Sequence, residues 1–202
     1  MINAPSREDL YKHLELCGRT CYKSEDKITE ESAEKFLRGI VKSGHTSVLE
    51  HAVISVRFVC DRGVTHEIVR HRLAAYSQES TRYCNYSKDK FGNQLTFIKP
   101  IFFDVDSHAY DDWIAACGRC ENVYMTMLAS GARPEEARSI LPNSIKTELV
   151  MTADITEWRH FFKMRCSPAA HPQIREVAIP LLKDMQTMYP ALFDDIDVRK
   201  LT

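Results

Sequence analysis

One short segment concentrates much of the chain's potential chemistry. Arg70, His71 and Arg72 are followed, after seven residues, by Ser80, and Arg82 comes two positions later. The guanidinium group of arginine is a rigid fork of donors that matches the oxygens of phosphate and carboxylate groups. The formal net charge of the whole chain is only -1, so this positive charge is local. The accompanying hydroxyl groups favour a binding site for an anionic ligand over a solvated basic helix surface.

The bulk composition is that of a soluble globular protein. The 202 residues are 44% hydrophobic and 27% charged, which suits one domain over residues 1–202. No apolar run approaches the roughly 20 residues of a membrane helix, and the first residues lack an apolar signal core. We therefore expect a cytoplasmic protein that binds no membrane. The near-neutral charge argues against extended nonspecific binding to nucleic acid.

Seven scattered cysteines predict free thiols in such a chain. Cys117 and Cys120 could form a redox pair, or half of a zinc site with Cys17 and Cys21 as the other half. Two cysteines one turn apart within a helical pattern are more often packing residues, so we expect no metal. Cys166, next to an arginine, is a weak candidate for a nucleophile.

The N-terminal part predicts two helices and one strand. Ser6 begins a helix that runs to about residue 22, and a second helix extends from Thr29 to a stop at Gly44. Residues 45–51 are too polar and irregular for a core segment. The next residues alternate between apolar and polar, which predicts a strand whose buried face carries Ile54, Val56, Phe58 and Cys60.

The pattern around the arginine-rich segment leaves two arrangements open. Residues 64–73 fit a helix with Ile68, Val69 and Leu73 directed inward. Neighbouring residues on a helix point about 100° apart, so Arg70 and Arg72 would lie on nearly opposite sides. Either the helix ends before them, or the two arginines serve different pockets or different subunits. Extended chain after residue 75 would place Gln78, Ser80 and Arg82 on one face.

The C-terminal part alternates strands and helices. Strands are predicted at 95–99 and 146–153, and helices at 107–130, 134–141, 155–166 and from 172 onward, the last eased at Pro180. The helix at 107–130 carries an apolar stripe from Tyr110 to Leu128 that is typical of a core or a subunit interface.

Four polar segments occur in a distinctive order, at 45–51, 70–82, 138 and 154–171. Together they resemble the flavin-dependent thymidylate synthases, whose defining pattern is RHR, seven residues and then Ser. The flanking stretches HTSVLEH, SQESTRY, EEARSILP and RHFFKMRCSPAAHPQIRE agree as well. The resemblance extends from residue 45 to about residue 178.

This resemblance implies an α+β fold, with helices packed on an antiparallel or mixed sheet in a single domain. It implies an enzyme that methylates C5 of the uracil in dUMP, with 5,10-methylenetetrahydrofolate as carbon donor, FAD as reductant and NADPH to re-reduce the flavin. Members of the family are homotetramers with active sites where subunits meet. The family uses no cysteine nucleophile, so the cysteines are left out of the mechanism. The implied partners are small molecules rather than nucleic acid.

The resemblance also assigns roles to individual residues. Arg165 and Ser80 are the catalytic candidates, since Arg165 resembles the arginine that binds the pyrimidine and favours its ionisation at N3. The implied FAD-binding residues are His45, Ser47, Arg70, His71, Arg72, Gln78, Asp154, Ile155, Thr156 and His160. The implied dUMP-binding residues are Glu67, Arg70, Gln78, Glu79, Ser80, Thr81, Arg82, Arg138 and Arg165. Many family members carry Asn at the position of Asp154, and an anion there requires hydrogen bonds from ribose or backbone donors.

Two other classes of protein fit parts of the sequence. A nucleotide- or RNA-binding module without chemistry could use the same arginines on phosphate groups. A zinc-thiolate protein could use the four cysteines named above. The absorption bands of oxidised flavin after purification distinguish the enzyme from both.

Overall fold

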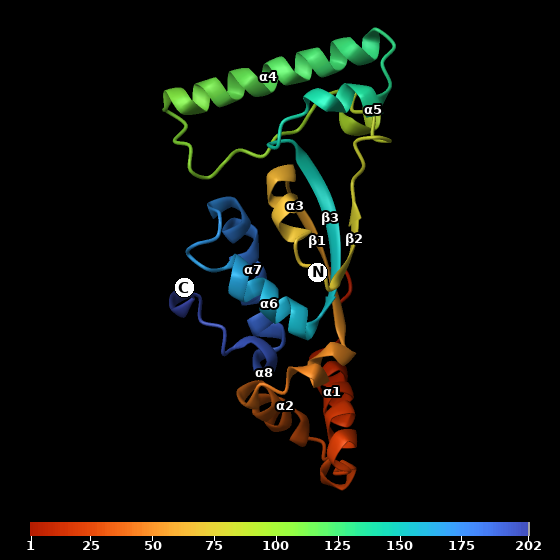
Figure 1. Ribbon diagram of the computed structural model, residues 1–202, viewed down its shortest axis with the longest axis vertical. Coiled ribbons are helices and arrows are strands. Elements are labelled where there is room, and N and C mark those ends of the chain that lie inside the picture. The colour runs from red at the N-terminus through yellow and green to blue at the C-terminus, as the bar shows by residue number, and fades with distance from the viewer. Residues whose placement is uncertain (202) are drawn as a thin grey trace. The chain divides into compact units, whose positions relative to one another are not determined.

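The structure is a computed structural model that describes residues 1–201, and it confirms the predicted α+β class (Figure 1). Its small antiparallel sheet has the strand order β1-β3-β2, formed by β1 (Val53–Asp61), β2 (Ala74–Gln78) and β3 (Lys146–Asp154). The buried residues of β1 include Ile54, Val56, Phe58 and Cys60, as the alternation predicts. No helix in the described part of the chain is long and apolar enough to cross a membrane.

The described chain forms two compact units. The first, here called the terminal unit, comprises residues 1–57, 71–76 and 150–202. The second, the central unit, comprises residues 58–70 and 77–149. The single domain over residues 1–202 stays a prediction.

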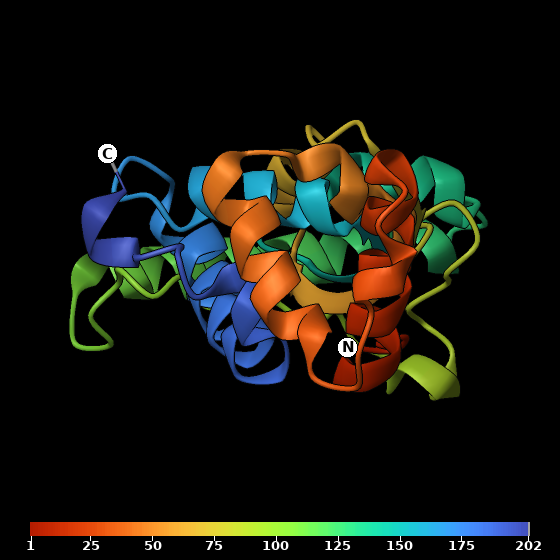
Figure 2. The same cartoon turned by 90° about the horizontal axis from the view of Figure 1, so that it is seen from below.

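The terminal unit contains α1 (Arg7–Tyr22), α2 (Ser32–Ser43), α6 (Ile155–Arg165), α7 (Pro172–Met188) and α8 (Pro190–Phe193). Short 3-10 helices lie at Glu25–Lys27 (η1), Thr46–His51 (η2) and Val198–Lys200 (η5). Figure 2 shows α1 and α2 side by side, and α7 packs against α6. The core of this unit includes Trp158, Phe161, Phe162 and Phe193, which are fully buried.

Local hydrogen bonds explain the ends of the first two helices. The hydroxyl of Ser6 accepts from the Asp9 N–H at 3.1 Å and caps α1, as predicted. Gly44 ends α2 with φ +74°, a left-handed conformation that glycine adopts without strain. The start of α2 lies three residues later than predicted, because the Thr29 N–H donates to the Ser32 side chain and forms a turn ahead of the helix.

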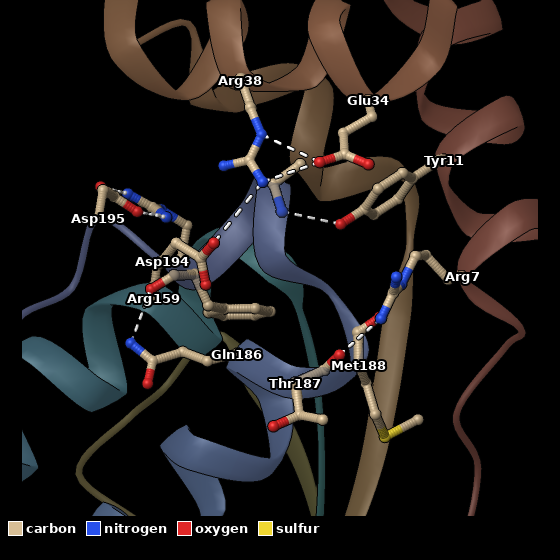
Figure 3. Close-up of polar contacts among 12 residues, drawn as sticks. Arg7, Tyr11, Glu34, Arg38, Arg159, Gln186, Thr187, Met188, Asp194 and Asp195 are labelled. Atoms are coloured by element: carbon tan, nitrogen blue, oxygen red, sulfur yellow. Dashed lines mark hydrogen bonds and ion pairs between the residues drawn. The ribbon is translucent and has the colours of Figure 1, made fainter. Parts of the chain in front are cut away.

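Several hydrogen bonds connect the C-terminal segment to helices α1 and α6 (Figure 3). Arg7 donates from Nε to the carbonyl oxygen of Met188 and from Nη2 to that of Thr187, both at 2.6 Å. The Tyr11 hydroxyl accepts from the Ala191 N–H at 2.9 Å. Arg159, on α6, binds both carboxylate oxygens of Asp195, at 2.7 and 2.6 Å. These contacts keep α6 fixed relative to the C-terminal segment, which matters for the site that α6 carries.

The central unit contains α3 (Arg62–Ile68), α4 (His108–Ala129) and α5 (Pro134–Ala137), with short 3-10 helices at Asp89–Phe91 (η3) and Arg138–Ile140 (η4). Its small core includes Tyr86, Leu95, Tyr124, Ala137 and Ile145. Only Cys117 and Tyr124 of the described α4 residues are buried, whereas Ile114 is 47% and Val123 42% exposed. The apolar stripe of α4 is therefore only partly covered within this chain, with Met127 and Leu128 packed against the core.

Several boundaries differ from the sequence-based expectations. Helix α3 ends at Ile68, before the arginine-rich segment, which is one of the arrangements that the sequence leaves open, but Leu73 is 74% exposed rather than inward. Val69 is also exposed. Strand β2 ends at Gln78, because the Cys84 N–H donates to the Ser80 carbonyl at 2.9 Å and turns the chain.

Two further segments were predicted wrongly. The strand expected at 95–99 is reduced to an isolated bridge between Phe97 and Ile145. The segment 45–51 does enter the core, because η2 turns Val48 and Leu49 inward and leaves Glu50 exposed. All seven cysteines are free thiols, as expected.

Candidate active site

Helix α6 carries several of the candidate residues, and its first turn is fixed by three hydrogen bonds. The Asp154 carboxylate accepts from the Glu157 N–H at 2.7 Å and caps the helix. The Thr156 hydroxyl donates to the Thr46 carbonyl at 2.7 Å, and the Ile155 N–H donates to the Ala52 carbonyl at 3.2 Å. Burial raises the pKa of Asp154. Asp154 thus has the backbone donor that an anion at this position requires.

His71 forms the centre of a buried polar cluster in the terminal unit. Its ring is 4% exposed, and its Nδ1 lies 2.8 Å from Glu157 Oε1. Arg165 donates from Nε to His71 Nε2 at 3.0 Å. Because an arginine N–H can only donate, His71 Nε2 must carry a lone pair, so the ring is neutral with its proton on Nδ1. That proton is then donated to Glu157.

The surroundings of His71 favour this neutral state. Burial and the nearby positive charge of Arg165 lower the pKa of His71, and together they exceed the opposite effect of Glu157. The Tyr76 hydroxyl donates to the carbonyl oxygen of His71. Phe161 lies edge-on to the imidazole with ring centroids 5.0 Å apart. The ring is therefore enclosed, and its orientation is set by partners on both nitrogens.

His160 completes the cluster from the exposed side of α6. Its ring centroid lies 5.3 Å from that of His71, and one potential ligand atom from each of His71, Glu157 and His160 lies within 4.8 Å of the others. These donor types can bind a metal ion, but His71 Nε2 faces the guanidinium of Arg165 and Nδ1 faces Glu157. A cation on Nε2 would have to displace Arg165, and a cation on Nδ1 would move the ring proton to Nε2, where it would face the N–H of Arg165, so the cluster as arranged does not suit a metal.

The segment from Gln78 to Arg82 lies in the central unit, and its first two side chains are held by other protein groups. Gln78 Nε2 donates to the hydroxyls of Thr65 at 3.0 Å and Thr147 at 3.4 Å. Glu79 accepts from the Tyr86 hydroxyl at 2.8 Å and pairs with Lys146 at 3.3 Å. Its N–H also donates to the Glu148 carbonyl at 2.8 Å. The Glu79 carboxylate is therefore committed to the protein.

The remaining residues of this segment differ in exposure. The Ser80 hydroxyl accepts from the Arg82 N–H at 3.3 Å, and Thr81 is buried. Arg82 is exposed, with its guanidinium 3.6 Å from Glu135 and over the ring of Tyr83. Arg138 is exposed on η4.

The structure brings together some of the predicted residues within each unit. In the terminal unit, His71, His160 and Arg165 meet, and Thr156 joins α6 to η2, which carries Ser47. His45, Ser47 and Arg72 are exposed there. In the central unit, the contiguous segment from Gln78 to Arg82 forms one group, whereas Glu67 is half-buried on α3 and Arg70 is exposed after it. The assignment of these residues to FAD or dUMP stays a prediction.

Glu157, the partner of His71, is not among the residues predicted from the sequence. Its position three residues after Asp154 fits the pattern of a capped helix start, and it precedes His160 by three residues on the same helix. These local signals mark Glu157 as a residue of interest on α6. Its pairing with His71, 86 positions away, has no local signal. Lys146, 67 positions from Glu79, was missed for the same reason, and Tyr86 was missed although it lies only seven positions away.

Comparison with known proteins gives a consistent result. Residues 7–191 match the family described as thymidylate synthase complementing protein. The chain is 35% identical over 169 residues to the flavin-dependent thymidylate synthase of Pyrococcus furiosus, covering 83% of this chain and 68% of that protein. It is 34% identical over 210 residues to the protein of the same name from Mycobacterium sp. strain JLS, covering 93% and 80%. It is 32% identical over 187 residues to the flavin-dependent thymidylate synthase of Geobacter sulfurreducens, covering 89% of this chain and 79% of that protein.

Proposed function

Because the chain belongs to the thymidylate synthase complementing protein family, we propose that it is a flavin-dependent thymidylate synthase. In this proposal it methylates C5 of dUMP to give dTMP, with 5,10-methylenetetrahydrofolate as carbon donor. FAD supplies the reducing equivalents when bound, and NADPH restores its reduced form. The observation that carries the proposal is the family match over residues 7–191, which includes the RHR-x7-Ser pattern and Arg165.

Arg165 is proposed as the catalytic residue toward the pyrimidine. A guanidinium lowers the free energy of negative charge on the ring, which favours ionisation at N3 and makes C5 a better nucleophile. The contact with His71 supports this role, because a neutral acceptor at 3.0 Å fixes the Nε side of the guanidinium without repelling it. A protonated His71 could not accept from Arg165, so the lowered pKa of His71 favours the arrangement.

The phosphate of dUMP is proposed to bind exposed cations of the central unit. Arg82 and Arg138 are exposed, and arginine matches phosphate oxygens with paired donors. Ser80 is proposed to contact the base through its hydroxyl. Glu79 would contribute indirectly, since Tyr86 and Lys146 already hold its carboxylate and thereby fix the segment that follows.

The residues present fit the chemistry of FAD. Arg70, Arg72, Ser47 and His160 are exposed donors that suit a diphosphate and a polar ring system. Asp154 and Ile155 serve the start of α6 through their own hydrogen bonds. They would therefore contribute to flavin binding mainly by holding the helix start in place.

The proposed enzyme is a cytoplasmic homotetramer with active sites where subunits meet. Support for an oligomer comes from α4, whose exposed apolar residues Ile114 and Val123 have no core to cover within this chain. Its proposed ligands are dUMP, the folate, FAD and NADPH, and no nucleic acid.

Anaerobic incubation with dUMP, 5,10-methylenetetrahydrofolate and NADPH, assayed for dTMP, tests the proposal. We expect a yellow protein with the absorption bands of oxidised flavin and dTMP formation that depends on every component. Omission of NADPH is the control for the source of reducing equivalents. A folded protein that binds no added FAD and forms no dTMP would contradict the proposed function.

A further inference from the structure

We infer that Glu157 is a positioning residue for this reaction, which sets the tautomer of His71 so that His71 in turn holds Arg165. The inference rests on the proposed function, because it assigns Glu157 a part in organising the arginine that binds the pyrimidine. It concerns three residues of the terminal unit, and each of the two links between them is a hydrogen bond of 3.0 Å or less.

The arrangement follows from the geometry of α6. Glu157 and Arg165 lie eight residues apart on this helix, which is a separation of about 12 Å along its axis. The imidazole of His71 bridges them, with Nδ1 directed at Glu157 and Nε2 at Arg165. Asp154 fixes the main chain of Glu157 through the helix cap, and this limits the positions that the Glu157 carboxylate can take.

The two tautomers of a neutral His71 differ sharply in this setting. With the proton on Nδ1, the ring donates to Glu157 and accepts from Arg165, so both contacts are favourable. With the proton on Nε2, an N–H would face the N–H of Arg165, and the Glu157 carboxylate would face a lone pair. Glu157 is buried, which strengthens its preference for a donor. The carboxylate therefore selects the tautomer that can hold the arginine.

Other groups around His71 do not provide the same selection. Tyr76 donates to the main-chain carbonyl of His71 rather than to its ring. The exposed His160 and the apolar Phe161 approach the ring by edge contacts. Only Glu157 among the described partners offers an anionic acceptor to Nδ1. Removing this carboxylate should therefore allow His71 to populate the tautomer with its proton on Nε2.

The tautomer can be measured directly by nitrogen NMR on the purified protein labelled with ¹⁵N-histidine, with FAD added. The His71→Gln variant assigns the resonances by their loss. We expect His71 of the parent protein to be neutral with the proton on Nδ1 at pH 8, and Glu157→Ala to show a substantial population with the proton on Nε2. A parent protein with the proton on Nε2 would overturn the inference.

Turnover provides a second measurement that separates positioning from stability. Glu157→Ala should lower kcat for dTMP formation roughly 10- to 100-fold, the usual range for loss of an orienting partner of a functional group. Glu157→Gln keeps an oxygen that can accept from Nδ1, so it should restore most of the activity. Glu176→Gln, on an exposed position of α7, removes a charge from the same unit and should leave kcat unchanged.

The outcomes distinguish failure of the positioning role of Glu157 from failure of the proposed function. If the parent chain forms dTMP and Glu157→Ala retains its kcat per bound flavin, the positioning role fails while the proposed function stands. If the parent chain forms no dTMP, the proposed function fails, and the tautomer measurement still decides whether Glu157 sets the state of His71. Lower thermal stability of Glu157→Ala with parental kcat counts against the inference, because a merely structural residue would give that result.

Discussion

Two arginines of α6 and two arginines of the central unit stand in opposite environments. On α6, Arg159 and Arg165 are bound by protein groups, Arg159 to Asp195 and Arg165 to the neutral nitrogen of His71. In the central unit, Arg82 and Arg138 are exposed, and the nearest carboxylate to Arg82 is 3.6 Å away. The difference indicates that the α6 arginines are organised before any ligand arrives, whereas the central arginines gain their strongest partners from a ligand.

The largest effect should come from Arg165, the organised arginine proposed to contact the pyrimidine. Arg165→Ala should lower the rate of dTMP formation about a hundredfold, corresponding to roughly 3 kcal/mol, because one preorganised charge contact is lost. Bound flavin should change little. Arg165→Lys should recover little activity, since an ammonium group lacks both the planar fork and the Nε–H that donates to His71. Measuring dTMP formation and flavin absorbance for both variants checks this, and parental turnover in Arg165→Ala would refute the assigned role.

Arg159 tests whether an organised arginine can serve stability alone. Its side chain is 6% exposed and also donates to the carbonyl of Leu192. Arg159→Ala should lower the free energy of unfolding by about 2 kcal/mol, because a buried carbonyl loses its donor and the end of the chain is released. Urea unfolding measures the change. Arg199→Ala, at an exposed position near the C-terminus, is the matched control and should alter stability little.

The exposed arginines should show a smaller effect of a different kind. Arg82→Ala should raise the KM for dUMP about tenfold, or roughly 1.4 kcal/mol, with a smaller change in kcat. Because the side chain is exposed, the difference between variant and parent should shrink as salt increases. Steady-state kinetics at low and high ionic strength give both values. A loss confined to kcat would place Arg82 with Arg165 and would remove the distinction between the two groups.

The secondary structure could be predicted from the sequence where the burial pattern and the helix caps are local and regular. Strands β1 and β3 and helix α6 were found because their buried residues follow regular periods and their ends carry local caps such as Asp154. The end of α3 stayed undecided because the apolar Val69 and Leu73 continue a helical spacing although both are exposed. A pattern of residue types does not show which apolar side chains the fold leaves uncovered.

The candidate site divides in a similar way. The arginines, His71 and the segment from Gln78 to Arg82 could be identified because their residue types match a family pattern. The partners that organise them, Glu157 for His71 and Lys146 for Glu79, lie far away in the sequence. Tertiary packing brings these partners together, so they became evident only in the folded chain.

Replacing the cysteines should have the smallest effect on turnover. The Cys166 variant tests whether this neighbour of Arg165 also takes part in catalysis. Cys166 is fully buried, and burial raises the pKa of its thiol to about 12, so at neutral pH it is protonated and a poor nucleophile. Cys166→Ala should keep dTMP formation near the parental rate but lower the free energy of unfolding by about 1 kcal/mol, because a small apolar side chain leaves a gap. Replacing Cys117 and Cys120 together should likewise spare activity. Turnover per bound flavin, measured beside urea unfolding, separates the two quantities. A folded, flavin-loaded Cys166→Ala protein without activity would show that the reaction uses this thiol, and the proposed mechanism would be wrong.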